Sequence, residues 1–73
     1  MGKSAKGTAL EELCDFRITY RRFLEFYENY LFQLKLDEET PDNVITAIEH
    51  EVDFYKERVK AIEIKIVEMK KLL

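Results

Sequence analysis

The chain has 73 residues, and 15 acidic against 12 basic side chains give it a formal net charge of −3. Hydrophobic residues make up 47% and charged residues 37%, with one proline and two glycines, so the composition predicts an all-α protein and excludes the disordered and membrane-spanning classes. The negative charge also disfavours duplex nucleic acid as an obligate partner, because that affinity depends mainly on neutralising phosphates with Lys and Arg.

The first segment, residues 1–7, has no hydrophobic periodicity and contains both glycines, so we expect a flexible lead. A helix is predicted for about residues 8–36, because Thr8 can act as N-cap and Glu11 follows three residues later, as in a capping box. Apolar residues then recur at spacings of four and three, which predicts a continuous apolar stripe along this helix. The stripe comprises Ala9, Leu13, Phe16, Tyr20, Phe23, Tyr27, Tyr30 and Leu34, with Leu10, Leu24 and Leu31 on one flank.

A turn and a second helix are predicted next. The segment 37–40 has no apolar residue, and Thr40-Pro41-Asp42 combines a good N-cap with a proline suited to the first helical position. The second helix is expected over residues 41–73, where an apolar heptad stripe indicates that another helix covers it. Two helices of matched length joined by a short turn predict an antiparallel hairpin in one domain, residues 8–73. The second stripe comprises Ile45, Ile48, Val52, Tyr55, Val59, Ile62, Ile66, Met69 and Leu73.

Both helices carry apolar residues beyond these two stripes. Leaving a large apolar side chain in water forgoes roughly 1.5 to 3 kcal/mol, and a domain of this size buries only about 60% of the surface of its unfolded chain. We therefore expect the hairpin to dimerise into a four-helix bundle or coiled-coil assembly, in either orientation. The alternative is that a different protein covers these apolar residues. The expected interface comprises Tyr20, Phe23, Phe26, Tyr27, Tyr30, Phe32, Val52, Phe54, Val59, Ile62 and Ile66.

The residues that could support chemistry are few. His50 is the only histidine and has a single carboxylate, Asp53, at helical spacing, so a solvated surface histidine is expected rather than a metal ligand. Cys14 is the only cysteine, lies far from His50 along the hairpin, and is expected to pack against its neighbours. We expect no enzyme, no catalytic residue, no metal and no cofactor.

The expected function is a non-enzymatic protein-protein interaction module, an adaptor or regulatory subunit that acts through self-assembly. The alternative is a nucleic-acid-associated accessory protein, because Arg17, Arg21 and Arg22 are interleaved with aromatic residues and could contact RNA or single strands. The lone cysteine and the missing secretory pattern favour the cytoplasm. No stretch reaches the roughly 18 apolar residues needed to cross a membrane, so no membrane partner is expected.

Overall fold

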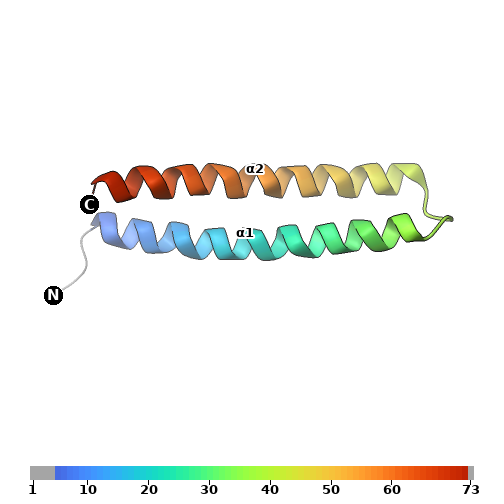
Figure 1. Ribbon diagram of the computed structural model, residues 1–73, viewed down its shortest axis with the longest axis horizontal. Helices are drawn as coiled ribbons and strands as arrows, with labels where there is room; N and C mark the ends of the chain where they lie inside the picture. Colours follow the sequence, from blue (N-terminus) through green and yellow to red (C-terminus); the bar gives the residue numbers. More distant parts are fainter. Residues whose placement is uncertain (1–4, 73) are drawn as a thin grey trace.

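The structure, a computed structural model, describes residues 5–72; residues 1–4, which belong to the expected lead, and Leu73 lie outside the described part. Two helices, α1 (Ala5–Leu36) and α2 (Asp42–Leu72), run antiparallel and side by side along their lengths (Figure 1). The predicted all-α helical hairpin is confirmed.

Helix α1 begins at Ala5, three residues before the expected start. Thr8 therefore lies inside the helix, and its expected role as N-cap is corrected. Ala5 and Lys6 are residue types with high helix propensity, which favours an extension of α1 ahead of Thr8.

The turn is held by hydrogen bonds that centre on Asp37. The Asp37 carbonyl accepts from the Thr40 N–H at 3.1 Å, and its side-chain Oδ1 accepts from the Glu39 N–H at 3.0 Å. This side-chain bond mimics a backbone turn, as short acidic side chains often do. No residue in the described part of the chain has a positive φ, so the reversal uses no left-handed position.

Helix α2 starts at Asp42, one residue after Pro41. The Pro41 carbonyl accepts from the N–H groups of Val44 at 3.1 Å and Ile45 at 3.3 Å, and so begins the helical ladder. A proline suits this place because its nitrogen has no hydrogen to satisfy.

The core is a single line of contact between the helices. Its buried residues all come from α2, with exposed fractions of 3 to 9%. The remaining described members of the predicted α2 stripe are half-buried, so this stripe is confirmed. The buried residues are Val52, Val59, Ile62 and Ile66.

On α1 the side that faces α2 differs from the prediction. Phe16, Phe23 and Tyr30, alternate members of the predicted stripe, are exposed. The leucines at positions 10, 24 and 31, expected on the flank, are half-buried in their place. The line of α1 that packs on α2 therefore combines leucines with Tyr20 and Tyr27. The half-buried apolar residues are Leu10, Leu13, Tyr20, Leu24, Tyr27, Leu31 and Leu34, with Ala9 and Cys14 beside them.

The hairpin is thin for its length. It measures 58 × 19 × 13 Å, and its radius of gyration is 16.7 Å, where about 11 Å is typical of a compact chain of this size. Its accessible surface is 5878 Å², against roughly 4,800 Å² for an ordinary monomer of the same mass. Two helices alone thus leave an unusually large surface uncovered.

Candidate functional site: an aromatic face

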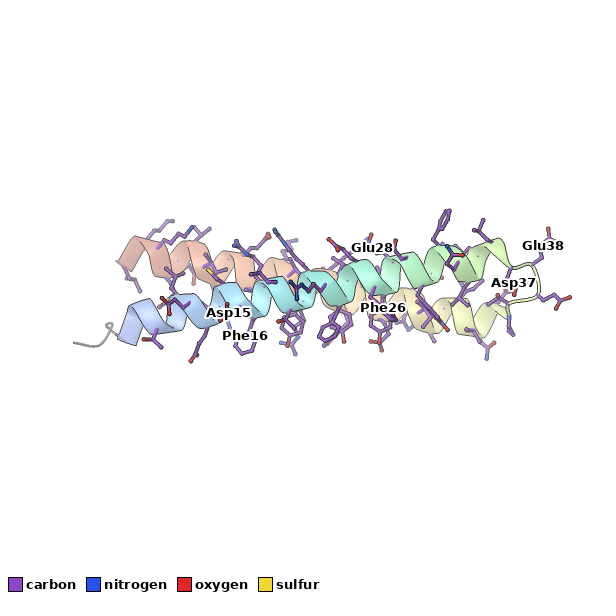
Figure 2. All side chains as sticks on the ribbon, turned by 90° about the horizontal axis from the view of Figure 1, so that it is seen from below. Asp15, Phe16, Phe26, Glu28, Asp37 and Glu38 are labelled. Atoms are coloured by element: carbon purple, nitrogen blue, oxygen red, sulfur yellow. The ribbon has the colours of Figure 1, made fainter. Side chains whose placement is uncertain are left out.

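Eight of the nine aromatic side chains form one continuous surface, which we call the aromatic face. Figure 2 shows Phe16 and Phe26 projecting from one edge of the hairpin, while Glu28 projects from the other edge. The ninth aromatic residue, Phe32, lines a groove together with Glu28 and so belongs to that other edge. The aromatic face comprises Phe16, Tyr20, Phe23, Phe26, Tyr27, Tyr30, Phe54 and Tyr55.

Tyr55 is the centre of this surface. Its ring centroid lies 5.4 Å from that of Tyr27, with the two planes nearly parallel, and 5.5 Å from that of Phe23. It lies 6.0 Å from Tyr20 and 5.2 Å from Phe54, which meets it edge-on. These separations fall in the range where aromatic pairs attract each other beyond their simple burial. Tyr55 therefore joins the rings of α1 to those of α2.

Phe26 extends the surface outward. Its ring meets Tyr27 edge-on at 5.3 Å and stacks with Tyr30 at 6.2 Å, yet the residue remains 61% exposed. Phe16, Phe23, Tyr30 and Phe54 are exposed as well. These five rings are thus part of a connected aromatic surface, yet each remains exposed to water.

Two charged residues flank the centre on α2. The Arg58 guanidinium lies over the Phe54 ring, 5.1 Å from its centroid, in a cation–π contact. Burial raises the pKa of the Tyr55 hydroxyl, and the neighbouring Tyr27, the charge of Glu51 and Tyr20 raise it further. Glu51 precedes Tyr55 by one helical turn, so it lies on the side of α2 that carries Tyr55 and Arg58. The aromatic face therefore carries one negative and one positive group around its middle.

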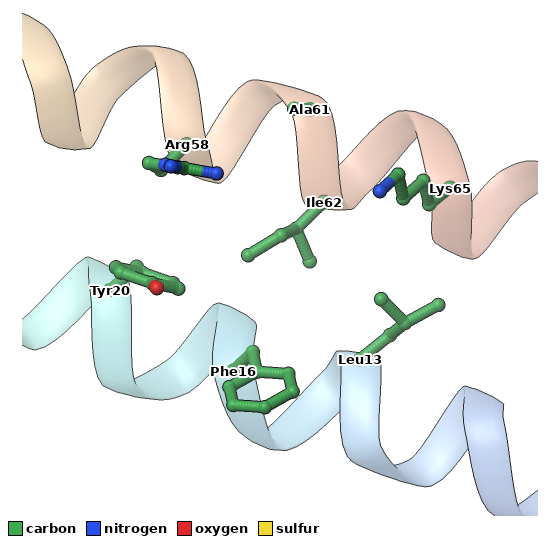
Figure 3. A pocket seen from close by; sticks show the side chains of 7 residues that line it. All are labelled: Leu13, Phe16, Tyr20, Arg58, Ala61, Ile62 and Lys65. Atoms are coloured by element: carbon green, nitrogen blue, oxygen red, sulfur yellow. The ribbon is translucent and has the colours of Figure 1, made fainter.

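An open groove continues this surface toward the chain ends. Figure 3 shows Leu13 and Ile62 pointing toward each other between the helices, with Phe16 on the α1 side and Arg58 and Lys65 on the α2 side. Its ionisable groups other than the Tyr20 phenol are both basic, and it contains no carboxylate, thiol or imidazole. The groove can receive an apolar side chain, but it does not assemble a general acid–base pair or a nucleophile with its base.

The opposite face carries ion pairs within the chain. Arg21 pairs with Glu63, and Lys35 lies 4.0 Å from Glu49. Folding the chain back on its turn predicts Glu57 near Arg21 and Asp42 near Lys35, and it leaves Glu63 as a second candidate for the arginines; the structure pairs Arg21 with Glu63 and places Lys35 near Glu49. For Arg21 the reason is helical phase, since Glu63 follows Glu57 by six residues and is turned by about 120° around α2.

The three arginines of the alternative hypothesis do not all share one side of α1: Arg17 and Arg21, four residues apart, do, but Arg22 does not. Arg17 is half-buried, Arg21 is bound to Glu63, and Arg22 is exposed. Successive helical residues differ by about 100° in direction, so Arg21 and Arg22 point to different sides of α1. The structure does not gather them into a single basic surface.

The residues expected at an interface separate into three groups. Six lie on the aromatic face: Tyr20, Phe23, Phe26, Tyr27, Tyr30 and Phe54. Val52, Val59, Ile62 and Ile66 are already covered by α1, and Phe32 lies on the opposite face. Sequence reasoning did not assign Phe16, Tyr55, Glu51 or Arg58 to this site. The four-residue spacings from Glu51 to Tyr55 and from Phe54 to Arg58 were the available signal.

The remaining candidates lie apart from this surface. His50 is exposed and Cys14 half-buried, as expected. Within residues 5–72, no group of three or more His, Cys, Asp or Glu side chains is placed to hold a metal ion. Neither helix of the described part is long and apolar enough to cross a membrane.

Comparison with known proteins gives no relative from which a function could be transferred. No family model, no curated protein and no solved structure matches this chain.

Proposed function

We propose that this hairpin is a non-enzymatic interaction module that works by self-assembly: two copies meet through their aromatic faces and form a four-helix bundle. The cytoplasmic location expected from the lone cysteine belongs to the same proposal. The observation that carries it is the contiguity of the exposed rings around Tyr55.

The distribution of exposed apolar side chains supports this proposal. Five of the eleven large hydrophobic side chains that are exposed in the described residues lie on the aromatic face. Contiguous exposed apolar patches mark interaction surfaces more often than scattered single residues do. Aromatic residues are also enriched at the centres of protein interfaces, where they contribute much of the binding free energy.

The size of the face is also adequate. The broad side of the hairpin measures 58 by 19 Å, which is comparable with the roughly 800 Å² per partner that a standard stable interface buries. A second copy presents the same rings, and helical hairpins that pair in this way bury their apolar sides in one shared core. A homodimer therefore covers the surface without a further protein.

A matched pair of variants tests the proposal. Phe26 is 61% exposed and Phe32 is 60% exposed, and both belong to α1, but only Phe26 lies on the aromatic face. We expect Phe26→Ser to weaken dimerisation at least tenfold in sedimentation equilibrium, since a central aromatic anchor is worth about 2 kcal/mol or more. Phe32→Ser should leave the dimer affinity within about twofold of the wild type, because a residue outside the interface is nearly neutral.

Several outcomes would contradict the proposal. If the wild-type chain is a monomer at every concentration, or if the two serine variants weaken the dimer equally, the aromatic face is not the interface. Circular dichroism of both variants shows whether the helices are retained, so that unfolding is not mistaken for dissociation.

A further inference from the structure

Five of the six rings that α1 contributes to the aromatic face are placed symmetrically about Phe23. Phe16 and Tyr30 lie seven residues before and after it, and Tyr20 and Phe26 lie three residues before and after it. When two identical helices cross antiparallel on a two-fold axis, a residue a given number of positions before the axis meets the residue the same number after it. An axis at Phe23 would therefore place five of the six α1 rings opposite a ring of the other copy, while Tyr27 would meet Thr19.

The centre of α2 has a matching symmetry. Glu51 precedes the Phe54–Tyr55 pair by one helical turn, and Arg58 follows it by one turn. Tyr55 contacts Tyr20, Phe23 and Tyr27, so the middle of α2 lies level with Phe23 on α1. One two-fold axis can thus serve both helices. An axis between Phe54 and Tyr55 places Glu51 of each copy opposite Arg58 of the other.

From this shared symmetry we infer that the second copy lies antiparallel on the aromatic face, with the two-fold axis at the level of Phe23 and Tyr55. Two ion pairs, each between Glu51 of one hairpin and Arg58 of the other, then set the register. This inference rests on the proposed function, since it names the orientation in which the two aromatic faces meet.

A parallel arrangement lacks these features. It would set α2 of one copy against α1 of the other. Glu51 and Arg58 would then face the aromatic rings of α1 instead of each other. It would also bring two acidic turns together. Each turn contains Asp37, Glu38, Glu39 and Asp42 with no basic residue between them, and like charges held close together oppose association. The antiparallel arrangement places the two turns at opposite ends of the dimer.

Charge reversal tests the register. Glu51→Arg makes two like-charged pairs across the antiparallel interface, and Arg58→Glu does the same with the opposite sign. We expect each to weaken dimerisation about tenfold in sedimentation equilibrium, and the double variant Glu51→Arg/Arg58→Glu to recover most of the affinity. An equimolar mixture of the two single variants should form heterodimers in preference to either homodimer. Glu57→Arg is the matched control, because its side chain is turned by about 120° from that of Glu51 and lies outside the aromatic face.

The orientation can be measured directly with a spin label at the turn. The variant Glu38→Cys in a Cys14→Ser background carries one label per chain, and pulsed electron spin resonance then reports the distance between the two labels of the dimer. The turn lies about 15 residues from Phe23, so at 1.5 Å per residue the antiparallel dimer separates the labels by roughly 45 Å. A parallel dimer would bring them within roughly 25 Å, given helices packed about 10 Å apart.

Different results would overturn the proposed function and the inferred register. A wild-type chain that does not dimerise overturns the proposed function and this inference with it. A stable dimer with labels close together, or one whose affinity is unchanged by both single charge reversals, overturns the register and leaves self-assembly through the aromatic face standing.

Discussion

The two long faces of this hairpin expose similar side chains in different settings. On the aromatic face, Phe26 stacks among other rings and continues toward Tyr55. On the opposite face, Phe32 lies in a groove with Lys35, whose ammonium group is close to Glu49. The exposed fractions of the two phenylalanines are nearly equal. What distinguishes them is contiguity: Phe26 contacts other rings of a continuous apolar surface, whereas Phe32 is the one aromatic residue of a groove that also contains three charged side chains.

This difference indicates which exposed apolar groups need a partner. A single apolar side chain on a charged helix face is ordinary in soluble proteins. A row of rings that spans two helices is less ordinary, because contiguous apolar patches mark interaction surfaces. A flat surface of similar composition could bury all of its rings together. The opposite face mixes charged side chains with exposed apolar ones such as Phe32, Ile64 and Val67, whereas the aromatic face is a continuous row of rings.

The largest expected effect is on the free energy of unfolding, and it distinguishes the residues packed between the helices from those on either face. Ile66 is 3% exposed, and Ile64, two residues earlier on α2, is 52% exposed. Ile66→Asp removes a buried side chain and buries a charge, so it should cost about 4 kcal/mol or more, comparable with the whole stability of a chain of this size. Ile64→Asp should cost less than about 1 kcal/mol. Thermal unfolding followed by circular dichroism measures both, and equal melting temperatures for the two variants would refute the observed packing of α2.

A smaller effect is expected from the ion pair on the opposite face. Arg21 and Glu63 are both substantially exposed, and exposed pairs of this kind contribute about 0 to 1 kcal/mol. A double-mutant cycle with Arg21→Ala and Glu63→Ala should therefore give a coupling energy below about 1 kcal/mol, with dimer affinity unchanged. A large loss of dimer affinity in either variant would mean that this face, and not the aromatic face, meets the second copy.

The smallest expected effect is a change in melting temperature at alkaline pH, caused by the ionisation of Tyr55 at the centre of the aromatic face. Because the folded state raises the pKa of Tyr55 above its ordinary value of 10.0, the neutral phenol is favoured in the fold. Its contribution to stability is then complete below pH 10 and is lost as the pH rises through the folded pKa. Tyr55→Phe should flatten part of the fall in melting temperature above pH 10. An identical fall in the wild type and the variant would show that Tyr55 does not contribute to it.

The sequence was sufficient to predict the hairpin, the turn and the packed side of α2. The stripe on α2 has one continuous set of aliphatic residues, and Thr40-Pro41 marks the restart of the helix. On α1 two stripes with the same spacing compete, one leucine-rich and one aromatic, and they share Leu13, Tyr20, Tyr27 and Leu34. Spacing alone does not choose between them. The choice depends on how α1 is rotated about its own axis, and the structure turns the leucine-rich stripe toward α2.

The charges of the candidate site were harder to foresee for a related reason. Glu51 and Arg58 gain significance only when Tyr55 is known to lie level with Phe23. That level depends on the register between two helices, which helical periodicity does not fix. Axial level alone left Glu57 and Glu63 open as partners of the arginines, and helical phase selects Glu63 for Arg21.

The central claim is that the aromatic face holds a second copy of the chain, and the solution mass of the wild-type protein tests it most directly. Sedimentation equilibrium over a wide range of protein concentration should give a mass approaching twice the monomer mass of 8.8 kDa. A mass that stays at the monomer value at every concentration would contradict the account.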